Sequence, residues 1–288
     1  MTEVELILNA RATLGEGALW DVSEQCLHWV DIEGMKLHRF DPEARSDESW
    51  QFEHKIGTVV TRQSGGLMVA LSNGFASFDP ETSQMTRIMD PESSKPNNRF
   101  NDGKCDPVGR FWAGTMSVEG EEKAGSLYVL HPDLTVTIAL SEVTTSNGIV
   151  WSGDHRTMYY IDSPTRQVAA FDYDIGSGHI RNRRGVIEVP PELGYPDGMT
   201  IDSEGMLWIA HWEGSAVVRW NPLDGSILRK VDLPVSRVTS CALGGRALKT
   251  LYITTASNGI DPEVEPIAGG LFALEVETPG VPAVKFAG

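Results

Sequence analysis

One pattern recurs six times along the chain and constrains its fold more than any other feature. Each copy has a short apolar strand, a polar break, a second strand and a turn rich in Asp, Asn, Gly or Pro. The copies begin at Leu27, Leu67, Phe111, Met158, Leu207 and Leu251, so successive starts differ by 40, 44, 47, 49 and 44 residues. Repeats of this length that hold several strands each are typical of β-propeller blades.

The six copies predict an all-β, six-bladed β-propeller, which we expect to form a single domain over residues 1–288. Residues 4–8 form a spare apolar strand before the first copy. We expect this N-terminal strand to pair into the last blade and close the ring, because a closed ring leaves no free sheet edge there. The alternative fold is a pair of β-sandwiches with coincidental spacing, which six regular copies disfavour.

An acid or an amide lies at nearly the same place before four of the six copies. Glu16, Asn101, Asn147 and Asp197 precede the starts of their copies by 11, 10, 11 and 10 residues. The innermost strands of a propeller line its central channel, so equivalent positions in different blades form a ring. The sequence therefore predicts two carboxylates and two amides that face one axial cavity. The alternative interpretation is that these residues only form turns where strands begin.

Carboxylates packed together repel each other and are costly to bury, so a cation is their natural compensation. Carboxylate and amide oxygens suit a hard cation such as Ca²⁺, Mg²⁺ or Mn²⁺, and Zn²⁺ or Fe²⁺ can also occupy an oxygen site. The sequence has no GxSxG, HExxH or GxxxxGK[ST] motif for other catalytic chemistry. We therefore expect one divalent metal ion as the cofactor, with its identity left open.

The charge of the chain argues against two classes of partner. There are 40 Asp and Glu residues against 24 Lys and Arg residues, a net charge of −16 that repels nucleic acid and anionic lipid. Cys26, Cys105 and Cys241 are widely spaced and predict neither a disulfide framework nor a zinc knuckle. The first residues lack the basic and apolar segments of a signal peptide. We expect a cytoplasmic protein without a nucleic-acid, membrane or protein partner.

Four long segments carry a family resemblance: LGEGALWD at 14–21, NNRFNDGKCDPVGRFWAGTM at 97–116, SNGIVWSGD at 146–154 and YPDGMTIDSEGMLWIAHW at 195–212. They resemble the signatures of the gluconolactonase/regucalcin family, also called senescence marker protein-30, which includes luciferin-regenerating enzymes. The similarity covers essentially the whole chain. It implies a six-bladed propeller that hydrolyses a small-molecule sugar lactone with the help of a divalent metal.

The resemblance also implies roles for individual residues in the ring. Glu16, Asn147 and Asp197 match the family's metal ligands. We expect the metal to polarise the lactone carbonyl, and Asp197 to act as the general base for the attacking water.

The same resemblance places the substrate. Arg99 and Asn101 match residues that hold the sugar, and Glu119, within an acidic loop, matches a further substrate-binding acid. The chain departs from regucalcin itself at His211 and Trp212, where we expect a somewhat different pocket wall, which leaves the substrate preference open.

Two classes of function follow from these observations. The first is an enzyme, a lactonase for an aldono-1,5-lactone such as gluconolactone, with an arylesterase or organophosphate hydrolase as a variant on the same fold. The second is a calcium-binding regulatory protein of the regucalcin type. Arg99 and Asn101 favour the enzyme, because a calcium-binding protein does not need residues that position a substrate.

Overall fold

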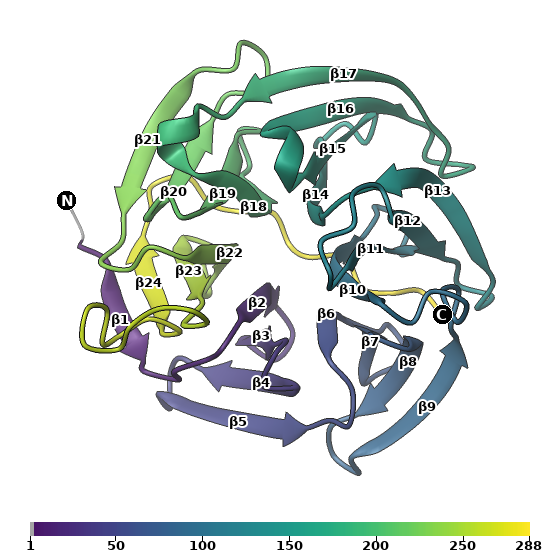
Figure 1. The fold of residues 1–288 in the computed structure, drawn as a ribbon, viewed down its shortest axis with the longest axis horizontal. Helices are drawn as coiled ribbons and strands as arrows, with labels where there is room; N and C mark the ends of the chain where they lie inside the picture. Colours follow the sequence, from purple (N-terminus) through teal and green to yellow (C-terminus); the bar gives the residue numbers. More distant parts are fainter. Residues whose placement is uncertain (1–2) are drawn as a thin grey trace.

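The strands form six four-stranded antiparallel sheets arranged around a central axis (Figure 1). The computed structural model describes residues 3–288. We number the sheets as blades one to six in chain order. The six-bladed propeller predicted from the repeats is thus confirmed, and the predicted domain range also includes residues 1–2, which lie outside the described part. Within the described part, no helix is long and apolar enough to cross a membrane.

The first five blades each follow the chain from the innermost strand to the outermost strand. Blade one contains β2 (Gly15–Asp21), β3 (Cys26–Asp31), β4 (Lys36–Asp41) and β5 (Ser46–Gln51). Blade two contains β6 (Ile56–Thr61), β7 (Leu67–Leu71), β8 (Gly74–Asp79) and β9 (Gln84–Met89). Blade three contains β10 (Asn98–Cys105), β11 (Phe111–Ser117), β12 (Gly125–Leu130) and β13 (Val136–Val143). Blade four contains β14 (Ser146–Trp151), β15 (Thr157–Asp162), β16 (Gln167–Tyr173) and β17 (Ile180–Glu188). Blade five contains β18 (Tyr195–Ile201), β19 (Leu207–Trp212), β20 (Ala216–Trp220) and β21 (Ile227–Asp232).

Blade six joins the two ends of the chain. Its strands are β22 (Val238–Gly244), β23 (Thr250–Thr255), β24 (Leu271–Glu275) and, outermost, β1 (Glu5–Leu8). Strand β1 pairs antiparallel with β24, with Glu5 opposite Ala273 and Leu6 opposite Phe272. The expectation that the N-terminal strand closes the last blade is therefore confirmed.

Burial falls from the innermost strand of a blade to the outermost strand. Every residue of β6 and β14 is buried, whereas β9 and β17 are mostly exposed. Inner strands are covered by neighbouring blades on both faces, which favours continuous apolar runs rather than alternation. Outer strands such as β9 (QMTRIM) carry polar residues because solvent covers them.

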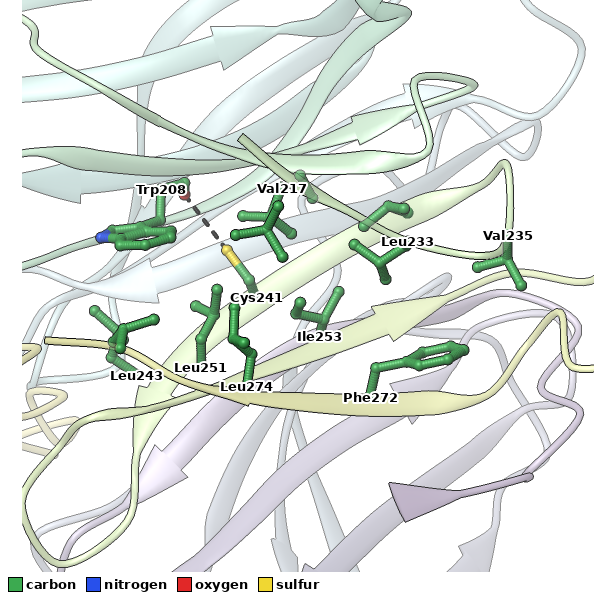
Figure 2. Close-up of a cluster of buried hydrophobic side chains, with 14 of the residues drawn as sticks. Trp208, Val217, Leu233, Val235, Cys241, Leu243, Leu251, Ile253, Phe272 and Leu274 are labelled. Atoms are coloured by element: carbon green, nitrogen blue, oxygen red, sulfur yellow. Dashed lines mark hydrogen bonds between the residues drawn. The ribbon is translucent and has the colours of Figure 1, made fainter. Parts of the chain in front are cut away.

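The apolar core lies between adjacent blades rather than inside any one blade. Figure 2 shows one such layer, in which Trp208, Val217 and Leu233 of blade five face Cys241 and Phe272 of blade six. Because a blade is a single sheet, it buries both faces only against its two neighbours. Closure of the ring therefore completes the core.

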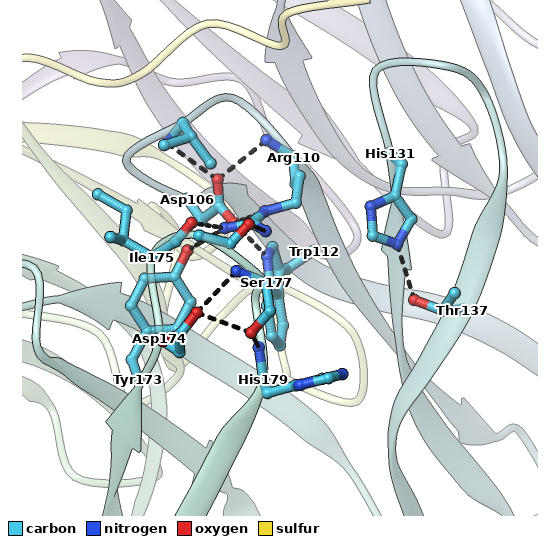
Figure 3. Close-up of polar contacts among 12 residues, drawn as sticks. Asp106, Arg110, Trp112, His131, Thr137, Tyr173, Asp174, Ile175, Ser177 and His179 are labelled. Atoms are coloured by element: carbon cyan, nitrogen blue, oxygen red, sulfur yellow. Dashed lines mark hydrogen bonds and ion pairs between the residues drawn. The ribbon is translucent and has the colours of Figure 1, made fainter.

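A buried ion pair joins blades three and four (Figure 3). The Asp106 carboxylate accepts hydrogen bonds from Arg110 Nε at 2.5 Å, Trp112 Nε1 at 2.9 Å and the Tyr173 hydroxyl at 2.8 Å. Asp202 of blade five makes a similar set, to Trp208 Nε1 at 3.0 Å and Arg219 Nε at 2.7 Å. Both acids lie in the turn between the first and second strands of their blade, and they bind the side chains around them.

The C-terminal tail, residues 276–288, crosses the central axis (Figure 1, yellow). Gly280 bridges to Asp202 of blade five, and Phe286 bridges to Arg62 of blade two. The Ala287 amide donates to Gly109 O of blade three at 3.0 Å. All three contacted turns follow the innermost strands, so the tail covers the end of the channel where those strands finish.

Candidate active site

The innermost strand of every blade has a register irregularity at the same level of the channel. In β2 the shift lies between Glu16 and Leu19, in β10 between Phe100 and Gly103, in β14 between Ser146 and Ile149 and in β18 between Pro196 and Met199. The innermost strands β6 and β22 show shifts between Ile56 and Thr58 and between Val238 and Ser240. A bulge breaks the alternation of side chains and re-aims them. The four predicted polar residues lie at or within these bulges, near the starts of their strands.

Glycines let these bulged strands approach one another. Gly17 has φ of +61°, a left-handed conformation that β-carbon-bearing residues avoid. A Cβ on Gly57 of blade two would lie 2.4 Å from Phe100 O and 2.6 Å from Asn101 O. Blade two therefore supplies no polar side chain here. Its glycine makes room for the blade-three backbone that carries Asn101.

Glu16 and Asp197 form a buried pair of acids from blades one and five. Desolvation, and the negative charge of Asp102, raise the pKa of Glu16 to about 8. Desolvation and the charge of Glu16 also raise the pKa of Asp197 well above its usual range. Asp197 Oδ1 is buried without a hydrogen-bond partner among residues 3–288. The pair therefore has unused acceptor capacity that a cation can satisfy.

The two amides are linked to each other and to the wall of the channel. Asn101 Nδ2 donates to Asn147 Oδ1 at 3.2 Å and to Ser146 O at 2.7 Å. Asn147 Nδ2 donates to Ser163 Oγ at 2.8 Å, and that hydroxyl donates to Pro196 O at 2.7 Å. Ser163 begins the short 3₁₀ helix η1 (Ser163–Thr165). Each amide nitrogen is thus fixed by an acceptor, which orients the amide oxygens.

Arg99 is buried beside the acids. Its Nη1 donates to Asn101 Oδ1 at 2.6 Å and to Phe100 O at 3.0 Å. The positive charge of the guanidinium lowers the pKa of both Glu16 and Asp197, which opposes the effect of burial. The structure therefore brings together Glu16, Arg99, Asn101, Asn147 and Asp197 at one end of the channel. Their functional roles stay predictions.

Sequence reasoning missed two charged residues that follow Asn101 in the same strand. Asp102 is buried, and its Oδ1 accepts the Gly103 amide at 2.7 Å. Lys104 Nζ donates to Met199 O at 2.8 Å. Strict alternation along β10 would send Asp102 away from Asn101, so only the bulge brings the charge of Asp102 to bear on Glu16. Both residues belong to the RFNDGK motif, and this motif is the sequence signal that could have identified them.

Glu119 lies apart from this group. It is exposed in the loop after β11, where its backbone amide is bonded to Ser117 Oγ at 3.2 Å. Arg99 pairs with Met116 in the ladder, so this loop leaves β11 at the Arg99 end of the channel. Glu119 is thus placed at the rim, and its role in binding substrate stays a prediction.

The expectation for His211 is wrong. Its side chain is fully buried inside blade five rather than on a pocket wall. His211 Nδ1 lies 2.9 Å from Leu193 O, next to the second 3₁₀ helix, η2 (Pro191–Leu193), and Trp220 Nε1 donates to His211 Nε2 at 3.3 Å. Burial lowers the pKa of His211 to about 4, so the ring is neutral. Trp212 is half-buried with Arg237 4.7 Å above its ring.

A cavity of about 530 Å³ occupies the opposite end of the channel. Trp20, Lys104 and Trp151 line it, and tail residues 281–284 close it. None of the predicted site residues is in its lining. The tail forms part of the cavity wall at this end, whereas the predicted site residues lie near the end at which the innermost strands begin.

The residues at that open end fit a divalent cation. Glu16, Asn147 and Asp197 offer two carboxylates and one amide oxygen, and the Asp197 oxygen without a partner shows that the protein alone does not satisfy them. Three acids, counting Asp102, outnumber the two nearby cations Arg99 and Lys104. An all-oxygen donor set in an acidic cavity suits a hard divalent metal.

A six-bladed propeller with an acidic, oxygen-rich group at one end of its channel belongs to the class of propellers with an axial site. Residues 14–257 match the family described as the SMP-30/gluconolactonase/LRE-like region, and the chain belongs to this family. The resemblance seen in the four sequence segments is therefore confirmed.

Individual relatives share the whole length of the chain. A Bacillus subtilis protein, provisionally named sugar lactone lactonase YvrE, is 42% identical over 283 residues, which is 97% of each chain. The solved structure of a luciferin-regenerating enzyme is 31% identical with a TM-score of 0.94 and covers 100% of both chains. That of a calcium-binding protein, regucalcin, from Agrobacterium tumefaciens is 26% identical with a TM-score of 0.93, covering 98% of this chain and 96% of that one.

Proposed function

We propose that this protein hydrolyses a sugar lactone, an aldono-1,5-lactone such as gluconolactone, with one divalent metal ion held by Glu16, Asn147 and Asp197. The observation that carries the proposal is the buried carboxylate pair with an unpartnered Asp197 oxygen, set beside Arg99 and Asn101. Membership of a family that includes proteins named as lactonases supports the same reaction. When bound, the metal supplies a Lewis acid that polarises the lactone carbonyl.

The side chains of the site have distinct tasks in this reaction. Water adds to the carbonyl carbon, the ring C–O bond breaks and the ring oxygen takes up a proton, which gives the open aldonic acid. Asp197 accepts the proton of the attacking water, because a carboxylate that would hold the metal lies within reach of water bound at the same place. Arg99 and Asn101 hold sugar hydroxyls, which supplies orientation. Glu119 contributes a further hydroxyl contact from the rim.

The test is hydrolysis of glucono-, galactono- and xylono-1,5-lactone by chelator-treated protein, before and after addition of Ca²⁺, Mg²⁺, Mn²⁺, Zn²⁺ or Fe²⁺. We expect activity above the spontaneous rate to return with a metal in the wild type but not in Asp197→Ala. Asp224→Asn, a change in an exposed turn of blade five, is the matched control and should keep full activity.

Other outcomes of the same experiment point elsewhere. Full activity in metal-stripped Asp197→Ala would contradict the site assignment. Calcium binding without turnover of any lactone would favour a regulatory protein, for which the name of the Agrobacterium relative gives the precedent. Turnover of phenyl acetate or an organophosphate in place of lactones would indicate the arylesterase variant.

A further inference from the structure

A second group of metal-binding side chains lies on blade one, away from the channel acids. Cys26 and His28 alternate with Leu27 in β3 and so lie on one face, and Glu24 lies in the turn just before this strand. Cys26 is 4% exposed and His28 is 2% exposed, while Glu24 lies at the surface. This end of blade one adjoins the C-terminal tail, where Lys285 Nζ lies 3.6 Å from Asp21 Oδ1. Glu16 is at the other end of β2.

The distances within this group match those of a tetrahedral metal site. Cys26 Sγ lies 3.7 Å from His28 Nε2 and 3.9 Å from Glu24 Oε2. All three ligand atoms lie within 4.8 Å of one another. Bonds of about 2.3 Å to sulfur and about 2.0–2.1 Å to nitrogen at a tetrahedral angle place those two atoms roughly 3.6 Å apart. Only small side-chain adjustments are therefore needed to enclose an ion.

The thiol already contacts an acid. Cys26 Sγ donates to Glu24 Oε2 at 3.9 Å, and Arg39 Nη1 lies 3.6 Å from the same oxygen. A bound metal replaces the thiol proton and competes with Arg39 for Glu24.

His28 presents one ring nitrogen to the group, because its Nε2 faces Cys26 Sγ at 3.7 Å. His28 Nδ1 has no hydrogen-bond partner among residues 3–288, so its second nitrogen lacks the support usual for a metal-bound histidine.

We propose that Glu24, Cys26 and His28 form a second metal site, for a borderline transition metal of the Zn²⁺ class. The sulfur and nitrogen donors select Zn²⁺, Co²⁺ or Cd²⁺ over Ca²⁺ and Mg²⁺. Three protein ligands leave one position open, and the unsupported His28 ring makes the ion exchangeable. The site is independent of the lactonase proposal, because it shares no residue with the channel acids.

The test is titration of chelator-treated, full-length protein with Co²⁺ or Cd²⁺, followed through the ultraviolet thiolate-to-metal charge-transfer band. This band reports a sulfur ligand, so metal bound by Glu16, Asn147 and Asp197 leaves it unchanged. We expect a band that saturates at one equivalent in the wild type and in Asp197→Ala, and no band in Cys26→Ser. Failure of the lactonase proposal would leave these spectra intact.

Two substitutions of exposed residues test the site without the risk that a change at buried Cys26 disturbs folding. Glu24→Gln changes only an exposed side chain and should weaken Co²⁺ binding by about tenfold or more, as loss of a ligand does. Glu81→Gln, which changes an exposed acid in the turn between β8 and β9 of blade two, should bind as the wild type does. A wild-type spectrum without the band, or a band that persists in Cys26→Ser, would overturn the proposal.

Discussion

At the scale of single residues, Glu16 and Asp197 are held together against their own repulsion. Burial and the charge of Asp102 raise the pKa of Glu16, and burial and the charge of Glu16 raise the pKa of Asp197, while Arg99 opposes both shifts. Folding therefore places a strained acid pair where the channel opens. A bound cation relieves this repulsion, so the acid pair lowers the folding stability mainly of the metal-free protein.

This cost predicts a pH-dependent stability of the metal-free protein. The folded pKa of Glu16, about 8, lies above its unfolded value of 4.5. The favourable contribution of the protonated group is complete below the unfolded value and is lost as pH rises through the folded one. In chelator, we expect thermal stability to fall from pH 5 to pH 9, and to fall less in Glu16→Gln. Equal slopes in variant and wild type would contradict this account, and metal-loaded wild type serves as the control.

Arg99 predicts a separation of substrate binding from metal binding. Arg99→Ala removes hydrogen bonds from a charged group, each worth about 1.5–3 kcal/mol, so we expect KM to rise roughly 10- to 100-fold. Metal affinity, measured by calorimetry, should not weaken, because the variant removes a positive charge beside the ligands. A fall in metal affinity with unchanged KM would place Arg99 among the structural supports instead.

At the scale of elements, the innermost strands show which structural features could be predicted from the sequence and which could not. The repeat starts and the spare strand at residues 4–8 were sufficient to predict six blades and ring closure, because apolar runs and turns report local structure. The bulges were not predicted, since a register shift depends on the neighbouring strand rather than on residue type. This is why Asp102 was missed. The burial of His211 was missed as well, because it depends on contacts with Leu193 and Trp220 that the local pattern does not report.

The Asp106 network predicts a large loss of stability from a small chemical change. Asp106→Asn keeps the shape of the side chain but leaves the buried Arg110 without its counter-charge, which we expect to cost about 3–5 kcal/mol. Urea unfolding measures this difference. Glu121→Gln, at an exposed position of the same blade, should change stability by no more than about 0.5 kcal/mol. An Asp106→Asn variant as stable as that control would show that the network contributes little.

At the scale of the whole molecule, the tail braces the ring on the face away from the site. Phe286 is fully buried against blades two and three, although it belongs to the last residues of the chain. The tail also contacts blades one and five, so four blades are tied together across the axis. The open end and the braced end of the channel are therefore separate in structure.

Phe286→Ala tests this separation. Removal of a fully buried aromatic side chain should lower stability by about 3–5 kcal/mol. Lactone hydrolysis, measured well below the unfolding temperature, should keep its kcat/KM, because Phe286 lies at the end opposite Asp197. Val281→Ala, at a half-exposed tail position, is the matched control. A parallel loss of kcat/KM would show that the tail and the site are coupled.

The pairing of β1 with β24 joins the first and last strands of the propeller in chain order. Leu271 follows Glu5 by 266 residues, so at ~5–20 residues per second β24 leaves the ribosome roughly 13–53 s after β1. For that interval β1 has no partner strand, and blade one has no sixth blade to cover its other face. The ring that fixes the acids of blades one and five is therefore completed only after β24 has been synthesised.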